Sequence, residues 1–491
     1  MSDSASSDAS ERFEYPDVPA HLAETKGLGL IKYFGPGAII ASLTIGSGET
    51  VFASRSGAVF GYAVLWLLLL TAIAKGFQVY AGARHITLTG EHPLASWNGV
   101  PQLRGWFPFF LAALTILFFP FWLGGLPKML GTLTNWMANV SPEQENYDFM
   151  LKMWGTGFLA VGILFTLFQT YGFLEKFEAI VVGVLLVSLL AAAFASNPDW
   201  LAVFMGTVQP AMPKYPQWAL EKYPEEFGNR PVLRELAVYA GAMGGGTQDY
   251  LGYVGILREK KWGLMARTGD TNPGYASGRI PLPEDPGQIS LAMTWLRAPR
   301  IDVLVSFACV VVFTYTFVIL GAEVLHPREI APAGSELLTA QKDFLAQIHP
   351  TLTYLYQAGV FMAFFGTIVG AFEVYTRTAY ESVIAIFPRL GWSVQRVRLI
   401  TLTYAGVGAL FLLWSNVNAV NIVTPAAILS SVLTCGLWCL AAVWTDHVRI
   451  PEAYRMKTGL KVALLISGLF LTILGAGAAY EFFADLLTSS G

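Results

Sequence analysis

The chain has 491 residues, of which 54% are hydrophobic and only 13% charged, and its mean hydropathy is +0.51. Soluble domains carry about 25% charged residues, so this composition is not that of an ordinary soluble domain. The formal net charge of −3 argues against nucleic acid as a partner.

The first 25 residues differ from the rest because they are polar, rich in Ser and acidic. This composition is not that of a cleavable signal peptide, and we predict that residues 1–25 form a disordered cytoplasmic tail. The two longest later loops, 197–233 and 258–300, have neither the length nor the composition of a separate folded domain. Residues 26–491 are therefore expected to form one transmembrane domain.

Long apolar segments follow one another from the tail to the end of the chain. Runs of 18 or more apolar residues predict membrane-spanning helices. We therefore predict an all-α polytopic membrane protein with eleven transmembrane helices. Their approximate bounds are 32–56, 59–84, 106–125, 153–171, 177–195, 234–257, 301–321, 353–386, 397–414, 419–444 and 460–484.

The positions of Lys and Arg predict the orientation in the membrane. With the N-terminus in the cytoplasm, the inner segments hold 20 of these residues and the outer segments nine, while Lys75 and Arg377 fall within spans. Cytoplasmic segments carry an excess of basic residues. We therefore expect an integral protein of the plasma (inner) membrane with a cytoplasmic N-terminus and an external C-terminus. The lipid bilayer is an expected partner. The sequence does not define the oligomeric state, and a monomer is compatible with it.

Glycine interrupts the first and the sixth predicted span in corresponding places, at residues 46–48 and 244–246, and a carboxylate follows each break, Glu49 and Asp249. Glycine favours unwinding, and an unwound segment at membrane depth is tolerated only around a cavity or within protein. Matching breaks in two halves indicate the binding site of a transporter. Close helix packing through small residues is the alternative, but it does not explain the carboxylates.

The breaks divide the domain into two repeats of five spans, about 32–195 and 234–444, with an extra helix at about 460–484. An odd number of spans in each repeat forces the repeats into opposite orientations in the membrane. The predicted architecture is therefore a 5+5 inverted repeat with broken helices 1 and 6.

The residues at the breaks are the candidate substrate-cation site. A carboxylate at mid-membrane normally faces a cavity or a partner, so Glu49 and Asp249 are the candidate metal ligands. Oxygen ligands of this kind suit Mg²⁺, Ca²⁺ or Mn²⁺. The alternative is that Glu49 pairs with Arg55 or Lys75 and has only a structural role. The other candidate residues of the site are Gly46, Ser47, Gly245, Thr247 and Gln248.

Four further charged residues within spans are candidates for coupling or gating. Lys75 lies midway through the second span, where it either supplies a built-in counter-charge or packs against a structural acid. Glu373, Arg377 and Glu381 follow one another at i, i+4 spacing and share one helix face. These three form either a self-neutralising structural triad or part of an ion path.

Residues 35–90 resemble the first two helices of the Nramp family of divalent-metal/proton symporters, whose members typically read GP, DPGN, FGY, LW and TG there. The sixth span resembles the family weakly, through Gly241-Ala242. The matching positions are Gly35-Pro36, Gly48, Phe60-Gly61-Tyr62, Leu65-Trp66, Arg84, Thr89 and Gly90.

The resemblance implies the LeuT-like inverted-repeat fold shared with amino-acid transporters, but the family's metal site is altered. Its first-helix Asp and Asn align with Gly46 and Glu49, and its sixth-helix Met and His align with Gly245 and Thr247. The third span carries no acid for a proton path. Since some Nramp-related magnesium transporters also alter this site, the resemblance predicts changed metal selection and weak or absent proton coupling.

These observations predict a secondary transporter that moves a divalent metal cation, with Mg²⁺ or Mn²⁺ as the best candidates, by alternating access. No Cys or His is expected near the breaks, so hard cations should be preferred. The alternatives are an amino-acid or amine carrier of the same fold, because residues 45–48 read IGSG, and a non-transporting sensor. No motif indicates an enzyme. No cofactor is expected, apart from the transported cation and possible protons.

Overall fold

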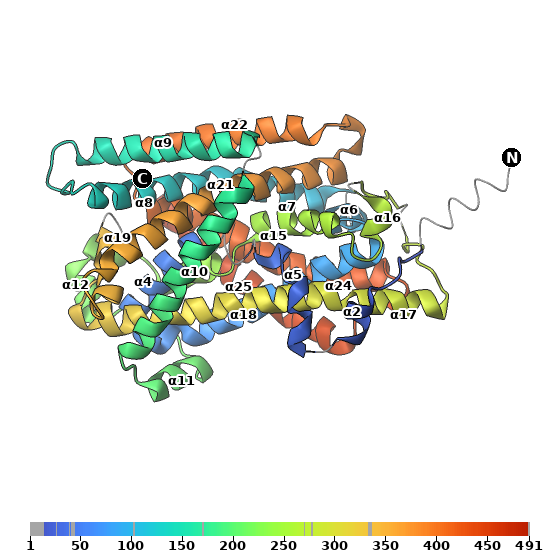
Figure 1. The fold of residues 1–491 in the computed structure, drawn as a ribbon, viewed down its shortest axis with the longest axis horizontal. Coiled ribbons are helices and arrows are strands. Elements are labelled where there is room, and N and C mark those ends of the chain that lie inside the picture. The colour runs from blue at the N-terminus through green and yellow to red at the C-terminus, as the bar shows by residue number, and fades with distance from the viewer. Residues whose placement is uncertain are drawn as a thin grey trace.

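The computed structural model describes residues 14–25, 27–38, 40, 45–101, 104–168, 171–269, 271–275, 278–331 and 336–489. The regular secondary structure of this part is helical, and no strand occurs in it. The long helices run roughly along the longest axis of the molecule (Figure 1). We call the end that carries α16 (Met265–Thr268) the α16 end, and the opposite end, with α19 (Glu336–Ala340), the α19 end.

The first predicted repeat contains one broken helix followed by long helices. Its elements are η2 (Ile45–Ala53), α4 (Ser54–Phe60), η3 (Gly61–Val64), α5 (Leu65–Thr89), α6 (Pro93–Ser96), α7 (Trp106–Leu117), α8 (Phe119–Met137), α9 (Tyr147–Phe168) and α10 (Tyr171–Ala195).

The loop between the predicted repeats contains short helices. They are α11 (Trp200–Val208), α12 (Gln217–Lys222) and α13 (Pro224–Phe227).

The second predicted repeat also begins with a broken helix. Its elements are α14 (Val232–Ala242), α15 (Thr247–Ile256), η5 (Leu257–Lys260), α16, α17 (Pro286–Trp295), α18 (Arg297–Leu320), η6 (Gly321–Leu325), α19, α20 (Asp343–Ala346), α21 (Leu352–Ile386), α22 (Val394–Trp414), α23 (Ala419–Ile428), η9 (Leu429–Leu433) and α24 (Thr434–Val448), and α25 (Thr458–Ser489) follows.

Local sequence explains where several helices begin and end. α5 ends at Gly90, whose φ of +68° gives the left-handed C-cap that glycine adopts readily. α23 begins after Asn418, whose side chain accepts a hydrogen bond from the backbone amide of Asn421. The third predicted span, 106–125, is too short, because α8 continues the helical path of α7 to Met137.

Eight helices of the described part are long and apolar enough to cross a membrane, or nine if α10 and α11, which are bent by 108°, form one broken span. The fold class, an all-α polytopic membrane protein, is therefore confirmed. The count of eleven stays a prediction for two reasons. The halves of a helix that is broken in the middle are each too short to be counted as a span, and residues 39 and 41–44 lie outside the described part.

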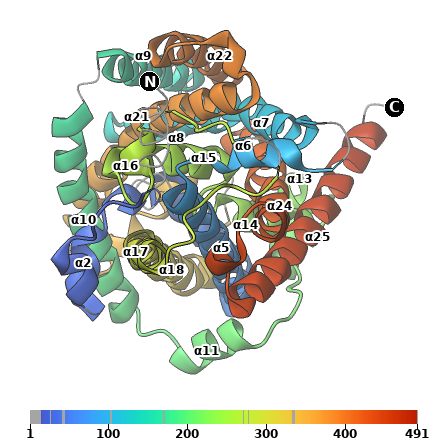
Figure 2. The ribbon, with the colours of Figure 1, turned by 90° about the vertical axis from the view of Figure 1, so that its right-hand side faces the viewer.

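The bundle has a buried centre, and the helices at its periphery expose apolar side chains. Viewed along the bundle, α5 lies near the middle, while α9, α10, α22 and α25 lie at the edge (Figure 2). The burial of side chains agrees, because α21 is mostly buried whereas α9, α22 and α25 expose many large apolar side chains. The central position of α5 brings its one lysine, Lys75, to the helix breaks.

The prediction of a disordered tail over residues 1–25 is wrong for the part that is described. Tyr15 is buried and its hydroxyl donates a 2.6 Å hydrogen bond to the carbonyl of Leu88, and Leu22 is fully buried. Tyr15 packs in a small apolar cluster with residues of the loop 258–300. Residues 1–13 lie outside the described residues.

Candidate cation site at the helix breaks

The two broken helices touch at their breaks. A Cβ atom on Gly48 would lie only 2.2 Å from the carbonyl oxygen of Ala242, so only glycine allows this approach. Gly244 and Gly245 have φ values of +69° and +86°, which also favour glycine. Gly244 and Gly245 thus form the turn between α14 and α15, whereas Gly46 and Gly48 lie within the π-helix η2. The unwinding predicted at residues 46–48 is therefore wrong, and Gly48 serves close packing.

Glu49 lies at this contact and is fully buried. Its Oε1 atom accepts hydrogen bonds from the backbone amide of Gly244 (3.4 Å) and the hydroxyl of Thr314 on α18 (3.5 Å). Its Oε2 atom has no hydrogen-bond partner among the described residues. A buried carboxylate with an unpaired oxygen is costly unless another group or a cation meets it.

The alternative that Glu49 pairs with Arg55 does not hold in this structure. The Arg55 guanidinium bonds instead to Glu235 (3.1 Å) and Glu226 (3.0 Å). Arg55 therefore does not neutralise the carboxylate of Glu49.

Lys75 is fully buried and reaches the break of helix 6 rather than a carboxylate. Its ammonium donates to four backbone carbonyls, those of Ala240 (2.8 Å), Gly241 (3.2 Å), Met243 (2.7 Å) and Gly245 (2.6 Å). It also lies within electrostatic range of both predicted metal ligands. The Lys75 ammonium thus lies at the break of helix 6, held by backbone oxygens, and its role in a cation site stays a prediction.

Asp249 caps the second half of the broken helix. Its Oδ2 atom accepts hydrogen bonds from the backbone amide of Gly246 (2.8 Å) and the side chain of Gln248 (2.9 Å). A carboxylate three residues after the N-cap satisfies an amide that the first turn leaves unpaired. This capping role accounts for Asp249 without a metal ion, and its role as a ligand stays a prediction.

Thr247 and Gln248 face α24 and η9. Thr434 donates to the Thr247 hydroxyl (2.7 Å), and Ser430 donates to the Gln248 side-chain oxygen (2.9 Å). The Sγ atom of Cys435 lies 3.5 Å from the Thr247 hydroxyl. The expectation that no Cys lies near the breaks is therefore wrong, because the π-helical η9 brings α24 against this turn.

Gly46 packs against α21. A Cβ atom there would lie 1.9 Å from the hydroxyl of Thr367 and 2.7 Å from the carbonyl of Ala363. The backbone of Ser47 belongs to η2, but its side chain lies outside the described part. Residue 46 therefore contributes a close helix contact, which an Asp at this position would prevent in this conformation.

The three coupling candidates on α21 belong to a network of charged side chains. This network lies near the end of α15 that is distant from the break. Arg377 bonds to Glu381 (3.1 Å), which also binds Arg258 (3.2 Å), and Glu373 binds Arg398 of α22 (2.8 Å). Glu373, Arg377 and Arg398 line a cavity of about 390 Å³ between α9, α15, α21 and α22 near the α16 end. The triad is thus neutralised partly within itself, through Arg377 and Glu381, and partly by Arg258 and Arg398 of neighbouring elements.

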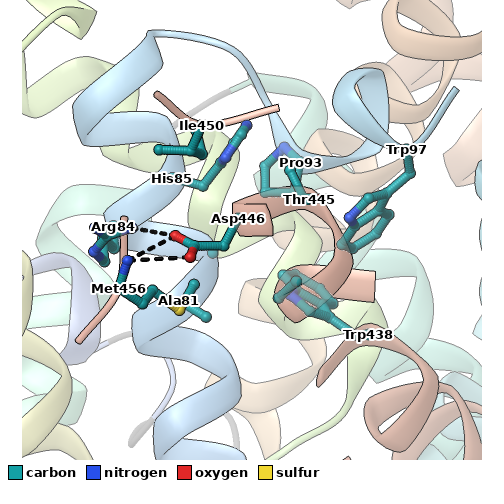
Figure 3. Close-up of a pocket in the computed structure, with 12 residues that line it drawn as sticks. Ala81, Arg84, His85, Pro93, Trp97, Trp438, Thr445, Asp446, Ile450 and Met456 are labelled. Carbon is teal, nitrogen blue, oxygen red and sulfur yellow. Dashed lines mark hydrogen bonds and ion pairs between the residues drawn. The ribbon is translucent and has the colours of Figure 1, made fainter. Parts of the chain in front are cut away.

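A second pocket, of about 10 Å³, lies between α5 and α24 and has room for about one water molecule (Figure 3). Asp446 there accepts hydrogen bonds from Arg84 (3.4 Å) and from the backbone amide of Met456 (2.9 Å). Its charged groups are satisfied by each other, so we assign it no ligand.

A model of the family described as natural resistance-associated macrophage protein-like, Nramp, matches residues 37–220. Over these residues the chain is similar to the Nramp family. This match confirms the resemblance that residues 35–90 indicate. No curated protein sequence matches the chain.

Solved structures of a manganese transporter from Eremococcus coleocola share the fold. A mutant form matches with 15% identity and a TM-score of 0.62, over 98% of this chain and 94% of that chain. The same transporter in complex with an aromatic bis-isothiourea substituted compound matches with 15% identity and a TM-score of 0.59, over 96% and 93%. At this identity the likeness shows the fold alone.

The Nramp-like fold is closed above the breaks, at the α19 end, by a lid that the sequence did not reveal. Gln341, between α19 and α20, is fully buried and donates to the carbonyl of Thr50 (2.8 Å) and the hydroxyl of Ser54 (2.7 Å). The hydroxyl of Tyr356 donates to its side-chain oxygen (2.9 Å). A lone Gln in a polar loop gives no sequence indication of this role.

A second latch lies below the breaks, toward the α16 end. The Asp302 carboxylate of α18 accepts hydrogen bonds from the amides of Gly35 (2.9 Å) and Gly37 (3.0 Å) and from the hydroxyl of Tyr253 on α15 (2.7 Å). At another part of α15, burial lowers the pKa of His92 to about 4, so the neutral ring contacts the carbonyl of Leu251. Between the two latches, Glu49 and Lys75 are fully buried.

Proposed function

We propose that the chain is a secondary transporter that moves a divalent metal cation by alternating access between the breaks of helices 1 and 6. The observation that carries this proposal is the fully buried carboxylate of Glu49, whose Oε2 atom lacks a partner among the described residues at the contact of the two breaks. The Nramp match and the fold shared with a manganese transporter support it. They also favour transport over an enzymatic function.

The ligand set favours Mg²⁺ or Mn²⁺. The ligand atoms that the structure offers at Glu49 are oxygens, the unpaired Oε2 atom of its own carboxylate and the hydroxyl of Thr314. Hard cations prefer such ligands. Cys435 lies one side chain away, behind Thr247, so sulfur could assist a softer ion only after a local rearrangement. Asp249 remains a proposed second carboxylate that would have to leave its capping position.

The direction of the path follows from the proposed orientation. We place the α16 end in the cytoplasm, with the N-terminus, and the α19 end outside. The cavity beside Glu373 and Arg377 then lies on the cytoplasmic side, where it would form part of the exit path for the ion.

Uptake into liposomes tests the proposal. The purified chain is reconstituted and supplied with Mg²⁺, Mn²⁺, Ca²⁺ or amino acids, and uptake of a divalent cation is the expected result. Glu49→Gln keeps the volume of the side chain but removes its charge. We expect this variant to reduce uptake by at least about 10-fold, because even the loss of a residue that only supports a metal ligand typically costs about 10–100-fold.

A matched control removes a carboxylate elsewhere in the same domain. Glu323 accepts a hydrogen bond from the hydroxyl of Tyr62 (2.5 Å) near the α19 end, away from the breaks. Glu323→Gln should leave uptake close to that of the unmodified chain. Uptake of amino acids without any divalent cation, or unchanged uptake in Glu49→Gln, would overturn the proposal.

A further inference from the structure

The four carbonyls that hold the Lys75 ammonium form a cage at the end of α14. They belong to the last turn of this helix and to the break that follows, where backbone carbonyls have no partner within the helix. The negative end of the helix dipole points to the same place. Such a cage has the chemistry of a binding site for a monovalent cation.

Geometry indicates that the group in the cage is a cation and not a neutral amine. All four neighbours are acceptors within 3.2 Å, and an ammonium has three N–H donors to offer them. A neutral amine would have only two donors, and its lone pair would face a carbonyl oxygen. The stem of Lys75 enters from α5, so the charge is tethered to the chain.

The positive charge of Lys75 also reduces the electrostatic cost of burying two carboxylates nearby. Glu49 and Asp249 are both buried beside the breaks and both act on Lys75 electrostatically. Two carboxylates in a region of low dielectric constant repel each other, and one positive charge between them offsets part of this cost. A water molecule in the cage could donate to only two of the four carbonyls and would supply no charge.

We propose that this carbonyl cage is a monovalent-cation site that Lys75 fills from within the chain, and that a free cation of ammonium type takes its place when the tether is removed. The consequence for transport rests on the proposed function. If Lys75 fills the cage permanently, no exchangeable monovalent cation is transported together with the divalent ion. Divalent uptake should therefore be the same in Na⁺, K⁺ and choline buffers.

The experiment is chemical rescue. Lys75→Ala removes the ammonium and leaves space for a small organic cation. The thermal midpoint of the purified variant is measured in methylammonium, ammonium, Na⁺, K⁺ and choline chlorides at equal ionic strength. A ligand that binds only the folded state raises the midpoint with its concentration. We expect methylammonium or ammonium to raise the midpoint of Lys75→Ala by more than about 3 °C in a saturable manner, and not that of the unmodified chain.

Lys128→Ala is the matched control. The Lys128 ammonium also donates to carbonyls at a helix end, those of Ser415 (2.8 Å) and Val417 (2.6 Å), but it is only partly buried and lies away from the breaks. Its removal should not create a saturable response to methylammonium. If Lys75→Ala does not fold in plain buffer, the yield of monodisperse protein expressed and purified with and without methylammonium replaces the midpoint as the measurement.

The outcomes separate this inference from the proposed function, because the rescue needs no divalent cation. An equal response to choline and methylammonium, or no response in midpoint and yield, would overturn the tethered-cation inference even if divalent uptake is found. Rescue by methylammonium together with normal uptake in Glu49→Gln would support the cage and refute the proposed divalent site.

Discussion

The contact between Gly48 and Ala242 makes a specific prediction about Gly48→Ala. The added Cβ atom would lie 2.2 Å from a backbone oxygen, whereas ordinary contact begins at about 3.4 Å. A backbone carbonyl has no rotamer to change, so helix 1 and α14 must separate by roughly 1 Å. Overpacking of this kind typically costs about 1–3 kcal/mol of folding stability.

The same displacement acts on the adjacent carboxylate. The two hydrogen bonds of Glu49, at 3.4 Å and 3.5 Å, are already long, and a further 1 Å would break them. A hydrogen bond to a charged group contributes about 1.5–3 kcal/mol. Because about 1.4 kcal/mol corresponds to a tenfold change in an equilibrium constant, the affinity for the divalent cation should fall at least about tenfold.

Gly131→Ala separates this effect from a general loss of stability. Its Cβ atom would lie 2.3 Å from the carbonyl of Leu151, a clash of the same kind between α8 and α9. Both variants should lower the thermal midpoint by similar amounts, while only Gly48→Ala should raise the half-saturating cation concentration for liposome uptake. Equal losses of cation affinity in the two variants would refute the role that we assign to the break.

Further predictions concern the latches and the ion. Gln341→Ala removes three hydrogen bonds of the lid, so hydrogen exchange of residues 45–56 should accelerate without a change at Asp302. Asp302→Asn should instead accelerate exchange over residues 35–38, because a neutral amide oxygen accepts the Gly35 and Gly37 amides less strongly than a carboxylate does, and the amide nitrogen cannot accept from Tyr253. Mg²⁺ or Mn²⁺ should be taken up better than Cd²⁺ by the unmodified chain, and a reversed order would contradict the oxygen-rich site. Uptake should not acidify the liposome interior in proportion to the cation when the membrane potential is clamped, and proportional acidification would reveal a proton path.

The sequence was sufficient to locate the break of helix 6, because few structures besides a binding site place glycines and a following carboxylate together at membrane depth. The same pattern at residues 46–48 lies in a π-helix, which keeps this segment helical despite its glycines. Glu49 could be selected for the same reason, and the structure places it at the contact between the breaks. The role of Asp249 was harder to predict. Its position three residues after Gly246 fits a helix cap, and a cap needs no metal ion.

Other features depended on contacts between distant parts of the chain. Nothing in the residues around Lys75 indicates that its partners are carbonyls about 165 residues later. The position of Cys435 beside Thr247 depends on the π-helical turn before α24. A sulfur-bearing variant, Gly245→Met, would look reasonable from the sequence as a way to soften the site. The φ of +86° at this residue makes it a strained choice.

At each end of the molecule, an ion pair or hydrogen bonds link the half of helix 1 to the neighbouring half of helix 6. At the α19 end, Arg55 of α4 binds Glu235 of α14, so these two halves are linked. At the α16 end, Asp302 links residues 35–37 to Tyr253 of α15. Each end can therefore open as one unit while the glycine breaks act as hinges, because glycine absorbs changes of φ and ψ at little steric cost. Opening one latch without the other is the condition that alternating access requires, and separate responses of the two ends to Gln341→Ala and Asp302→Asn are its measurable consequence.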